Sequence, residues 1–155
     1  MIKKIISGGQ AGADRAGLDA GKFLKIPTGG YCPKGYLTEN GYDTSLKSYG
    51  LIETESGLYE ERTLKNVLSG DGTVIFCNVD VDGNIIGLGT AFTHQLCLQY
   101  KKPVIKNPTS KQFIEWIKKN KIKILNVAGN RESQSHGIYN KTKKFLIQNI
   151  KKINL

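Results

Sequence analysis

Ser-Gly-Gly-Gln-Ala-Gly-Ala-Asp-Arg, residues 7–15, lies between a short apolar run and a helical pattern, and it predicts a turn from a strand into a helix. Ile2, Ile5 and Ile6 indicate the strand, and apolar residues at helical spacing from Ala13 onward indicate the helix. Glycines let the backbone turn tightly and approach a ligand closely, while the free N–H groups at a helix start attract an anion. The spacing matches neither the dinucleotide fingerprint nor the lysine-bearing phosphate loop, so the stretch alone leaves open a phosphate loop or a plain tight turn.

Strands and helices alternate along the rest of the chain. Apolar or β-branched runs predict strands at 26–31, 51–54, 73–77, 103–105 and 122–127. Helical patterns lie between them and after the last, beginning near Ser56, Thr90, Ser110 and Ile138. This alternation indicates a parallel sheet with helices on both faces, and we expect one α/β domain over residues 1–155. The segment 36–50 is polar and turn-rich without clear periodicity, so it is a candidate loop or lid.

Three turns of this predicted sheet contain glycine, at 7–15, 87–90 and 128–133. In a parallel sheet every strand-to-helix turn emerges at the same edge, where ligands sit at the point of strand-order reversal. We therefore expect the three turns to converge on one cleft, and their amides, hydroxyls and charges suit a phosphorylated heterocyclic ligand. The predicted ligand-binding residues are Ser7, Gly8, Gly9, Gln10, Gly12, Asp14, Arg15, Gly87, Gly89, Thr90, Asn130, Arg131, Glu132 and Ser133.

Arginine is rare in this chain, which takes most of its positive charge from lysine. The three arginines, Arg15, Arg62 and Arg131, each lie in a stretch that resembles a motif on other grounds. Guanidinium offers a planar fork for phosphate or carboxylate, so these residues are candidates for ligand contacts. The alternative is three structural ion pairs with nearby carboxylates. Arg62 is left out of the predicted site because it can instead anchor its own helix.

The net charge of +10 makes a nucleic-acid partner a hypothesis to test. The lysines are spread along predicted helix faces and strand ends, with no arginine-rich run and no aromatic platform between them. We therefore expect no nucleic-acid partner. A polyanion-binding module that acts through surface lysines is kept as the second alternative, because net charge alone attracts polyanions.

The three cysteines, Cys32, Cys77 and Cys97, indicate neither a disulfide framework nor a four-ligand zinc site. Reduced thiols indicate a cytoplasmic protein. No apolar run approaches the roughly 20 residues that cross a bilayer, and the N-terminus has no signal-peptide pattern, so we expect no membrane partner. His94 and His136 have no serine or cysteine partner at a recognisable spacing, and we assign no catalytic residue and no metal ligand.

Several blocks of sequence, taken in order, resemble the molybdenum carrier family. They are SGGQAGADR at 7–15, GGYCPKG at 29–35, Glu53-Thr54 through Tyr59 to Arg62-Thr63, Asn66-Val67 to Asp71-Gly72-Thr73, Gly89-Thr90, and LNVAG at 125–129 with Arg131-Glu132-Ser133. The resemblance covers nearly the whole chain. It implies a Rossmann-like parallel sheet, a homo-oligomer, and a site for a phosphate-bearing ligand, with the molybdenum cofactor or a nucleotide as the candidates.

One departure from the relatives of this family concerns catalysis. The related phosphoribohydrolases carry Pro-Gly-Gly-x-Gly-Thr-x-x-Glu, and that glutamate takes part in cleaving an N-glycosidic bond. Residues 85–93 here are IIGLGTAFT, so Thr93 stands where the glutamate would be, and threonine cannot act as a general acid or base. We therefore predict a binding protein, a molybdenum cofactor carrier or nucleotide-binding protein, without a catalytic centre. The enzyme alternative is a nucleotide hydrolase or phosphoribohydrolase that uses Asp14 or Glu53.

Overall fold

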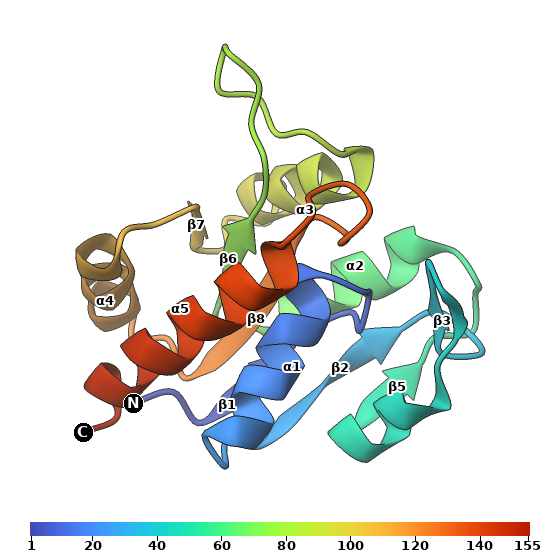
Figure 1. The fold of residues 1–155 in the computed structure, drawn as a ribbon, viewed down its shortest axis with the longest axis horizontal. Coiled ribbons are helices and arrows are strands. Elements are labelled where there is room, and N and C mark those ends of the chain that lie inside the picture. Colours follow the sequence, from blue (N-terminus) through green and yellow to red (C-terminus); the bar gives the residue numbers. More distant parts are fainter.

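Six parallel strands form the central sheet of the computed structural model, which describes residues 1–155 (Figure 1). Their order across the sheet is β5-β2-β1-β8-β6-β7. The strands are β1 (Lys4–Ile6), β2 (Thr28–Cys32), β5 (Leu51–Glu53), β6 (Gly72–Phe76), β7 (Val104–Lys106) and β8 (Ile124–Gly129). The helices are α1 (Ala13–Phe23), α2 (Tyr59–Ser69), α3 (Leu88–Gln99), α4 (Ser110–Lys119) and α5 (Ile138–Ile153). The predicted α/β class, a Rossmann-like parallel sheet between helices, is confirmed.

The last strand of the chain, β8, lies between β1 and β6 in the middle of the sheet. β6 is buried at all five positions, as expected for a continuous β-prone run covered on both faces. The chain moves outward from β1 through β2 to β5, and then returns across the sheet through α2 to β6. The strand order therefore reverses around β1, β8 and β6, and the crevice at their carboxyl ends is the expected place for a ligand.

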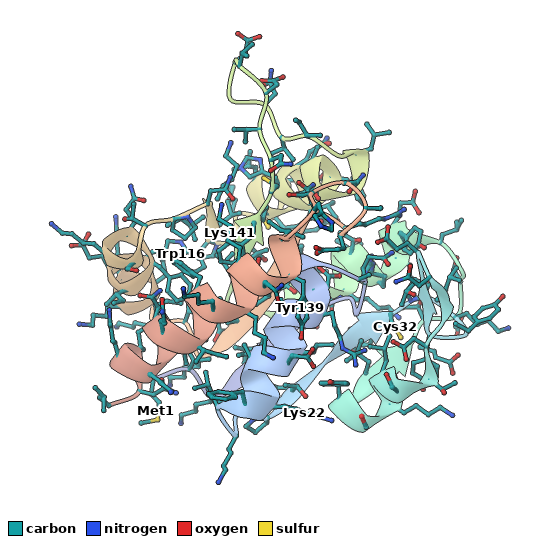
Figure 2. The ribbon with its side chains drawn as sticks, in the orientation of Figure 1. Met1, Lys22, Cys32, Trp116, Tyr139 and Lys141 are labelled. Carbon is teal, nitrogen blue, oxygen red and sulfur yellow. The ribbon has the colours of Figure 1, made fainter.

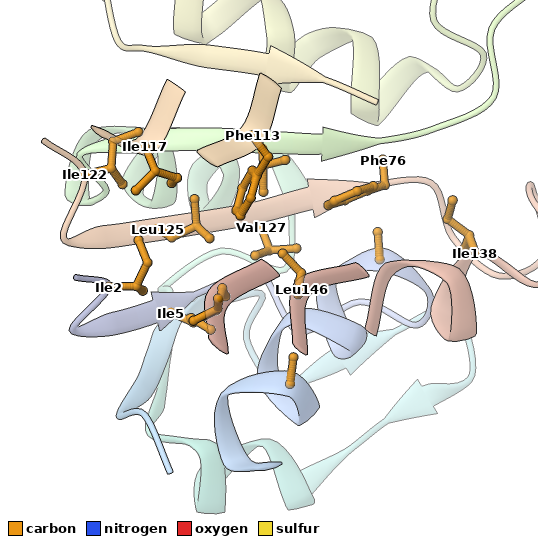
Figure 3. Close-up of a cluster of buried hydrophobic side chains, with 14 residues drawn as sticks. Ile2, Ile5, Phe76, Phe113, Ile117, Ile122, Leu125, Val127, Ile138 and Leu146 are labelled. Carbon is orange, nitrogen blue, oxygen red and sulfur yellow. The ribbon is translucent and has the colours of Figure 1, made fainter. Parts of the chain in front are cut away.

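Helices cover both faces of the sheet (Figure 1). α1, α4 and α5 lie on one face over the main apolar core, into which Phe76, Phe113 and Leu146 point (Figure 3). Phe145 packs edge-on against Phe76 and Phe113, with ring centroids 5.3 and 5.4 Å apart. α2 and α3 cover the other face over a smaller apolar cluster. None of the five helices combines the length and apolar character that crossing a membrane requires.

The segment 36–50 is more ordered than its sequence suggests. β3 (Leu37–Thr38) and β4 (Gly41–Tyr42) pair as an antiparallel hairpin, and a 3-10 helix, η1 (Thr44–Tyr49), follows. Asp19 of α1 accepts hydrogen bonds from the hydroxyl of Tyr49 and, at 2.5 Å, from that of Tyr139, which points from α5 toward α1 in Figure 2. Leu46 and Tyr49 are buried beside α1 and β5. The segment therefore braces that side of the sheet, and none of its residues lines the large cavity described below.

Two helix starts differ from the sequence-based expectation. The helix expected near Thr90 begins earlier, at Leu88, because Gly87 makes the preceding turn with a φ of 103°. The helix expected from Ser56 begins at Tyr59, because the Ser56 hydroxyl instead accepts a hydrogen bond from the Leu58 N–H in the turn before it. α4 begins at Ser110, as predicted, with Thr109 and Gln112 forming a capping box at its start.

The two ends of the chain lie side by side (Figure 1). The Ile2 N–H donates to Asn154 Oδ1 at 2.8 Å, and Asn154 Nδ2 donates to the Ile2 carbonyl at 3.1 Å. One amide side chain thus satisfies both backbone groups of a residue just before β1. This pairing fixes the end of α5 to the start of the sheet.

Gly17 of α1 provides a test of the helix packing. A Cβ built at Gly17 would lie 2.7 Å from the Cβ of Val127 in β8. Gly17→Ala should lower the free energy of unfolding by about 1–2 kcal/mol, because overpacking outweighs the helix propensity that alanine adds. Gly89→Ala in α3 is the matched control, since a Cβ there meets nothing within 4 Å, and its stability should equal or exceed that of the unmodified protein. Urea unfolding measures both, and a Gly17→Ala protein as stable as the control contradicts the close contact.

Candidate functional site

A cavity of about 600 Å³ lies at the carboxyl edge of the sheet, between α2 and α3. Its wall is made by residues from four segments, 8–14, 59–66, 88–93 and 126–134. The three glycine-containing turns expected to converge therefore do surround one cavity, and α2 adds a fourth wall. A volume of this size is typical of sites for small molecules.

The glycine-rich turn is held by its own side chains. The Ser7 hydroxyl donates to the Asp14 carbonyl at 3.0 Å and accepts from the Gly9 N–H at 3.2 Å. Gly9 and Gly12 have φ values of 75° and 100°, which favour glycine. A Cβ at Gly12 would lie 2.4 Å from the carbonyl oxygen of Asn130. Gly12 is therefore needed for the contact between this turn and the turn after β8.

Asp14 and Arg62 form a buried ion pair in the cavity wall. Arg62 Nη1 donates to Asp14 Oδ2 at 3.1 Å, and the Gln10 N–H donates to the same oxygen at 3.2 Å. Burial raises the pKa of the Asp14 carboxyl, and the Arg62 guanidinium and the Gln10 amide offset only part of that rise. Gly8 provides the space for this pair, because a Cβ at residue 8 would lie 1.5 Å from Arg62 Nη1.

Two buried donors in the cavity wall have no partner within the protein. Gln10 is 4% exposed, and its Oε1 accepts hydrogen bonds from the N–H groups of Glu39 and Ala11 at 2.7 and 3.0 Å. These bonds leave Gln10 Nε2 unpaired, and Arg62, 9% exposed, likewise leaves Nε unpaired. Buried polar atoms are nearly always hydrogen-bonded, so the two donors call for an acceptor that the protein itself does not supply.

The start of α3 faces the cavity without a side-chain cap. Its first amides lack intrahelical partners, and the helix dipole makes this end attractive to an anion. Asn130 positions it, since Nδ2 donates to the Ile86 carbonyl at 2.7 Å and to Thr90 Oγ1 at 3.2 Å. Gly89 leaves open space where a side chain would stand. This end of α3 can therefore accept an oxyanion at close range.

Arg131 lies at the cavity wall without an acidic partner: no carboxylate oxygen lies within 4.0 Å of its guanidinium nitrogens. Its guanidinium carbon is 5.0 Å from the centre of the Tyr59 ring, and that of Arg62 is 5.2 Å from the same ring. Tyr59 thus contacts both arginines of the cavity by cation–π interaction. Of the two arginines in the cavity wall, Arg62 is paired with Asp14, and Arg131 has no carboxylate partner.

The structure separates the fourteen predicted ligand-binding residues into two groups. Those that line the cavity are Gly8, Gln10, Asp14, Gly89, Thr90 and Arg131. The remainder lie outside it, and these are Ser7, Gly9, Gly12, Arg15, Gly87, Asn130, Glu132 and Ser133. Several of the second group support the first: Gly12, Ser7 and Asn130 hold the turns in place, as described above.

Arg15, Glu132 and Ser133 make other contacts. Arg15 pairs with Asp43 at 3.1 Å and with Asp19 at 3.5 Å, on the side of α1 that packs against η1. Glu132 accepts hydrogen bonds from the N–H groups of residues 137 and 139, at 2.5 and 3.0 Å, and so supports the start of α5. The Ser133 hydroxyl donates to Glu39 at 2.5 Å. Arg15 therefore fits the alternative of a structural ion pair, and Glu132 and Ser133 also bind protein groups outside the cavity.

Sequence-based prediction missed the wall that α2 provides. Besides Arg62, this wall contains Tyr59, Thr63 and Asn66, and the floor includes Asn126. A signal was present in the sequence: Arg62 and Asn66 are four residues apart, so they place two polar groups on one helix face. Both are buried, which an amphipathic surface helix does not require.

Asp14→Asn should change how stability depends on pH. The pKa of the Asp14 carboxyl is higher in the folded protein than its ordinary value of 3.8, so folding takes up a proton between these two values. The resulting stabilisation is present below the unfolded pKa and is lost as the pH rises through the folded one. The free energy of unfolding of the unmodified protein, minus that of Asp14→Asn, should therefore fall as the pH rises from about 4. Urea unfolding at a series of pH values measures this difference, and an increase with pH contradicts the raised pKa.

Comparisons with known proteins agree with this architecture. Residues 5–150 match the model of the circularly permutated YpsA SLOG family. A crystal structure at 1.45 Å resolution from Syntrophus aciditrophicus SB, named "Putative molybdenum carrier protein", is 38% identical, with a TM-score of 0.83 over 96% of this chain and 94% of that one. No curated protein matches the chain. The resemblance to molybdenum carrier proteins is thereby confirmed, and the chain belongs to the circularly permutated YpsA SLOG family.

Proposed function

We propose that this protein binds a phosphorylated heterocyclic ligand in the cavity between α2 and α3, as a carrier or sensor. The observation that carries the proposal is the pair of buried donors without partners, Gln10 Nε2 and Arg62 Nε. A phosphate group has several acceptor oxygens and a charge that arginine and free backbone amides recognise. The unpaired Arg131 and the uncapped start of α3 supply further donors at the same cavity.

The rest of the cavity wall suits a ring system. Tyr59, Phe92 and Leu88 offer aromatic and apolar surface, while Asn126 and Gln134 offer polar groups that can pair with the edge of a heterocycle. Small-molecule sites commonly combine an apolar lining with a few placed polar groups. The Syntrophus relative is named as a molybdenum carrier, so the molybdenum cofactor, a pterin that bears a phosphate, is one candidate ligand, and a nucleotide is the other.

The cellular compartment we propose is the cytoplasm. Cys32, Cys77 and Cys97 are all buried and free. Burial raises the pKa of the Cys32 thiol to about 11, with the Glu53 carboxylate adding to the rise, so this thiol is not in the reactive thiolate form. Free buried thiols are typical of proteins that remain in a reducing compartment.

Arg131→Gln should weaken ligand binding and leave the fold intact, because Arg131 has no acidic partner to lose. Removing a charge-assisted hydrogen bond of roughly 1.5–3 kcal/mol raises the dissociation constant by about 10- to 100-fold. Arg15→Gln is the matched control, since Arg15 lies outside the cavity, and its dissociation constant should stay unchanged. A thermal-shift screen of nucleoside monophosphates, nucleoside diphosphates and pterin phosphates identifies the probe, and isothermal titration then measures both variants.

The opposite results would contradict the assignment of the cavity. Loss of binding in Arg15→Gln with full binding in Arg131→Gln would indicate that the anion binds on the Arg15 side of the glycine-rich turn and not in the cavity. Absence of any stabilising compound, together with nucleic-acid affinity that falls steeply with salt, would favour the polyanion-binding module. Native mass spectrometry of the purified protein gives a check that does not depend on the choice of compounds.

A hydrolase remains a second candidate function because Asp14 lines the cavity and has a raised pKa. A carboxyl group of this kind can act as a general acid. Glu53, the other carboxylate considered, accepts from the Gly35 N–H at 2.6 Å and does not line the cavity. Thr93 lines the cavity, but its hydroxyl donates to the Gly89 carbonyl at 3.0 Å and offers no acid or base.

The hydrolase predicts that the protein releases free base from a nucleoside monophosphate. Asp14→Asn should then lower the turnover rate by about 100-fold or more, while the nucleotide still binds. Chromatographic detection of adenine, guanine, cytosine and uracil measures the reaction, and titration of the same variant measures binding. Undetectable release by the unmodified protein at saturating nucleotide excludes this candidate and leaves the carrier or sensor.

A further inference from the structure

The segment from the end of β6 to the end of α3 differs from the rest of the surface. Residues 83–100 contain no lysine, arginine, aspartate or glutamate, the longest such run in a chain of which 23% is charged. This segment also exposes much of the apolar surface. Of the thirteen large hydrophobic residues exposed in the whole chain, six lie between residues 79 and 100, namely Val79, Val81, Ile86, Leu88, Leu98 and Tyr100. The part of it that connects β6 to α3 projects from the body of the molecule, at the top of Figure 1.

α3 has large apolar residues on two of its sides and no charged residue. Its inner side is buried through Leu96 and Cys97, which pack with Val67 of α2. Its outer side exposes Leu88 and Leu98, which are 91% and 60% exposed. An uncharged helix with large apolar residues on both its inner and its outer side is expected to be covered on both sides, and nothing within this chain covers Leu88 and Leu98.

We propose that the outer side of α3 packs against the same helix of a second copy of this chain, in an antiparallel arrangement around a two-fold axis. Its outward residues are Leu88, Ala91, Gln95, Leu98 and Gln99, which lie within one face of a helix at 100° per residue. The first four are placed symmetrically about the level of residue 93. In an antiparallel pair, Leu88 therefore meets Leu98 of the other copy, and Ala91 meets Gln95, so the face is complementary to itself.

The charge of the chain favours a second copy as the occupant of this face. At a net charge of +10, two copies repel each other wherever lysine-rich surfaces meet, and the uncharged run 83–100 is the place where they can approach at least electrostatic cost. Thirteen of the residues 79–100 are exposed, fewer than the roughly 20–30 residues that each partner contributes to a standard interface, so the expected dimer is one that dissociates on dilution.

This interface borders the ligand site without depending on it. Leu88 lines the cavity as well as the outer side of α3, so the second copy lies next to the opening of the cavity. Sedimentation measures the mass of the assembly, whereas titration measures the binding of the ligand. Failure of one proposal therefore leaves the other standing.

Sedimentation velocity over a dilution series tests the interface. The unmodified protein should sediment as a dimer that dissociates on dilution. Leu88→Glu and Leu98→Lys should each raise the dimer dissociation constant by about 30-fold or more, because each places two charges in an apolar contact. The two substitutions together should restore the dimer, since an acid of one copy then faces a base of the other. The two positions are about 15 Å apart along one helix, so they cannot pair within one chain.

Ile52→Glu is the matched control. Ile52 is also an exposed apolar residue, but it lies on the edge strand β5, on the other side of the molecule in the strand order. It should leave the dimer unchanged, and circular dichroism should show that all four variants are folded. A monomer at every concentration, or a dimer lost only in Ile52→Glu, overturns the proposed face. A doubly substituted protein that remains monomeric while the single variants are folded overturns the antiparallel pairing.

Discussion

The buried ion pair between Asp14 and Arg62 is the interaction on which the cavity depends. It joins the start of α1 to the first turn of α2 across the carboxyl edge of the sheet, with Arg62 Nη1 at 3.1 Å from Asp14 Oδ2. Such a pair is costly to desolvate, and it stabilises a structure only when further hydrogen bonds satisfy its atoms. The Gln10 N–H supplies one of these bonds to Asp14. Gly8 is part of the same arrangement, because any side chain there would occupy the place of the guanidinium.

Two buried amide side chains differ in how they use their polar atoms. Asn130 accepts from the Asn78 N–H and donates to Ile86 and Thr90, so its polar atoms are engaged within the protein. Gln10 uses only its oxygen and leaves its nitrogen without a partner. Asn130 therefore builds the site, whereas Gln10 has a donor to offer. Both residues come from glycine-containing turns, and only their neighbours in space distinguish the two roles.

Sequence patterns predicted the features of the fold that depend on residues close together in the chain. The alternation of strands and helices, the convergence of the glycine-containing turns and the start of α4 follow from periodicity and turn residues within short windows. Local patterns do not show that Arg62 lines the cavity and Arg15 does not. That difference depends on their partners Asp14 and Asp43, which are 48 and 28 positions away in the sequence. The structure of the segment 36–50 could not be predicted for a similar reason: only Thr38, Leu46 and Tyr49 are buried in it, too few to give a period.

The site is a property of the sheet edge rather than of a contiguous motif. β8 is the last strand in the chain but lies beside β1, so the turn after it meets the first glycine-rich turn. The Asn154 side chain is hydrogen-bonded to both backbone groups of Ile2, so the end of α5 and the segment before β1 lie together although they are far apart in the sequence. The polar groups that line the cavity therefore depend on their place in the sheet, and their order along the chain is free to differ from that in known phosphate-loop motifs.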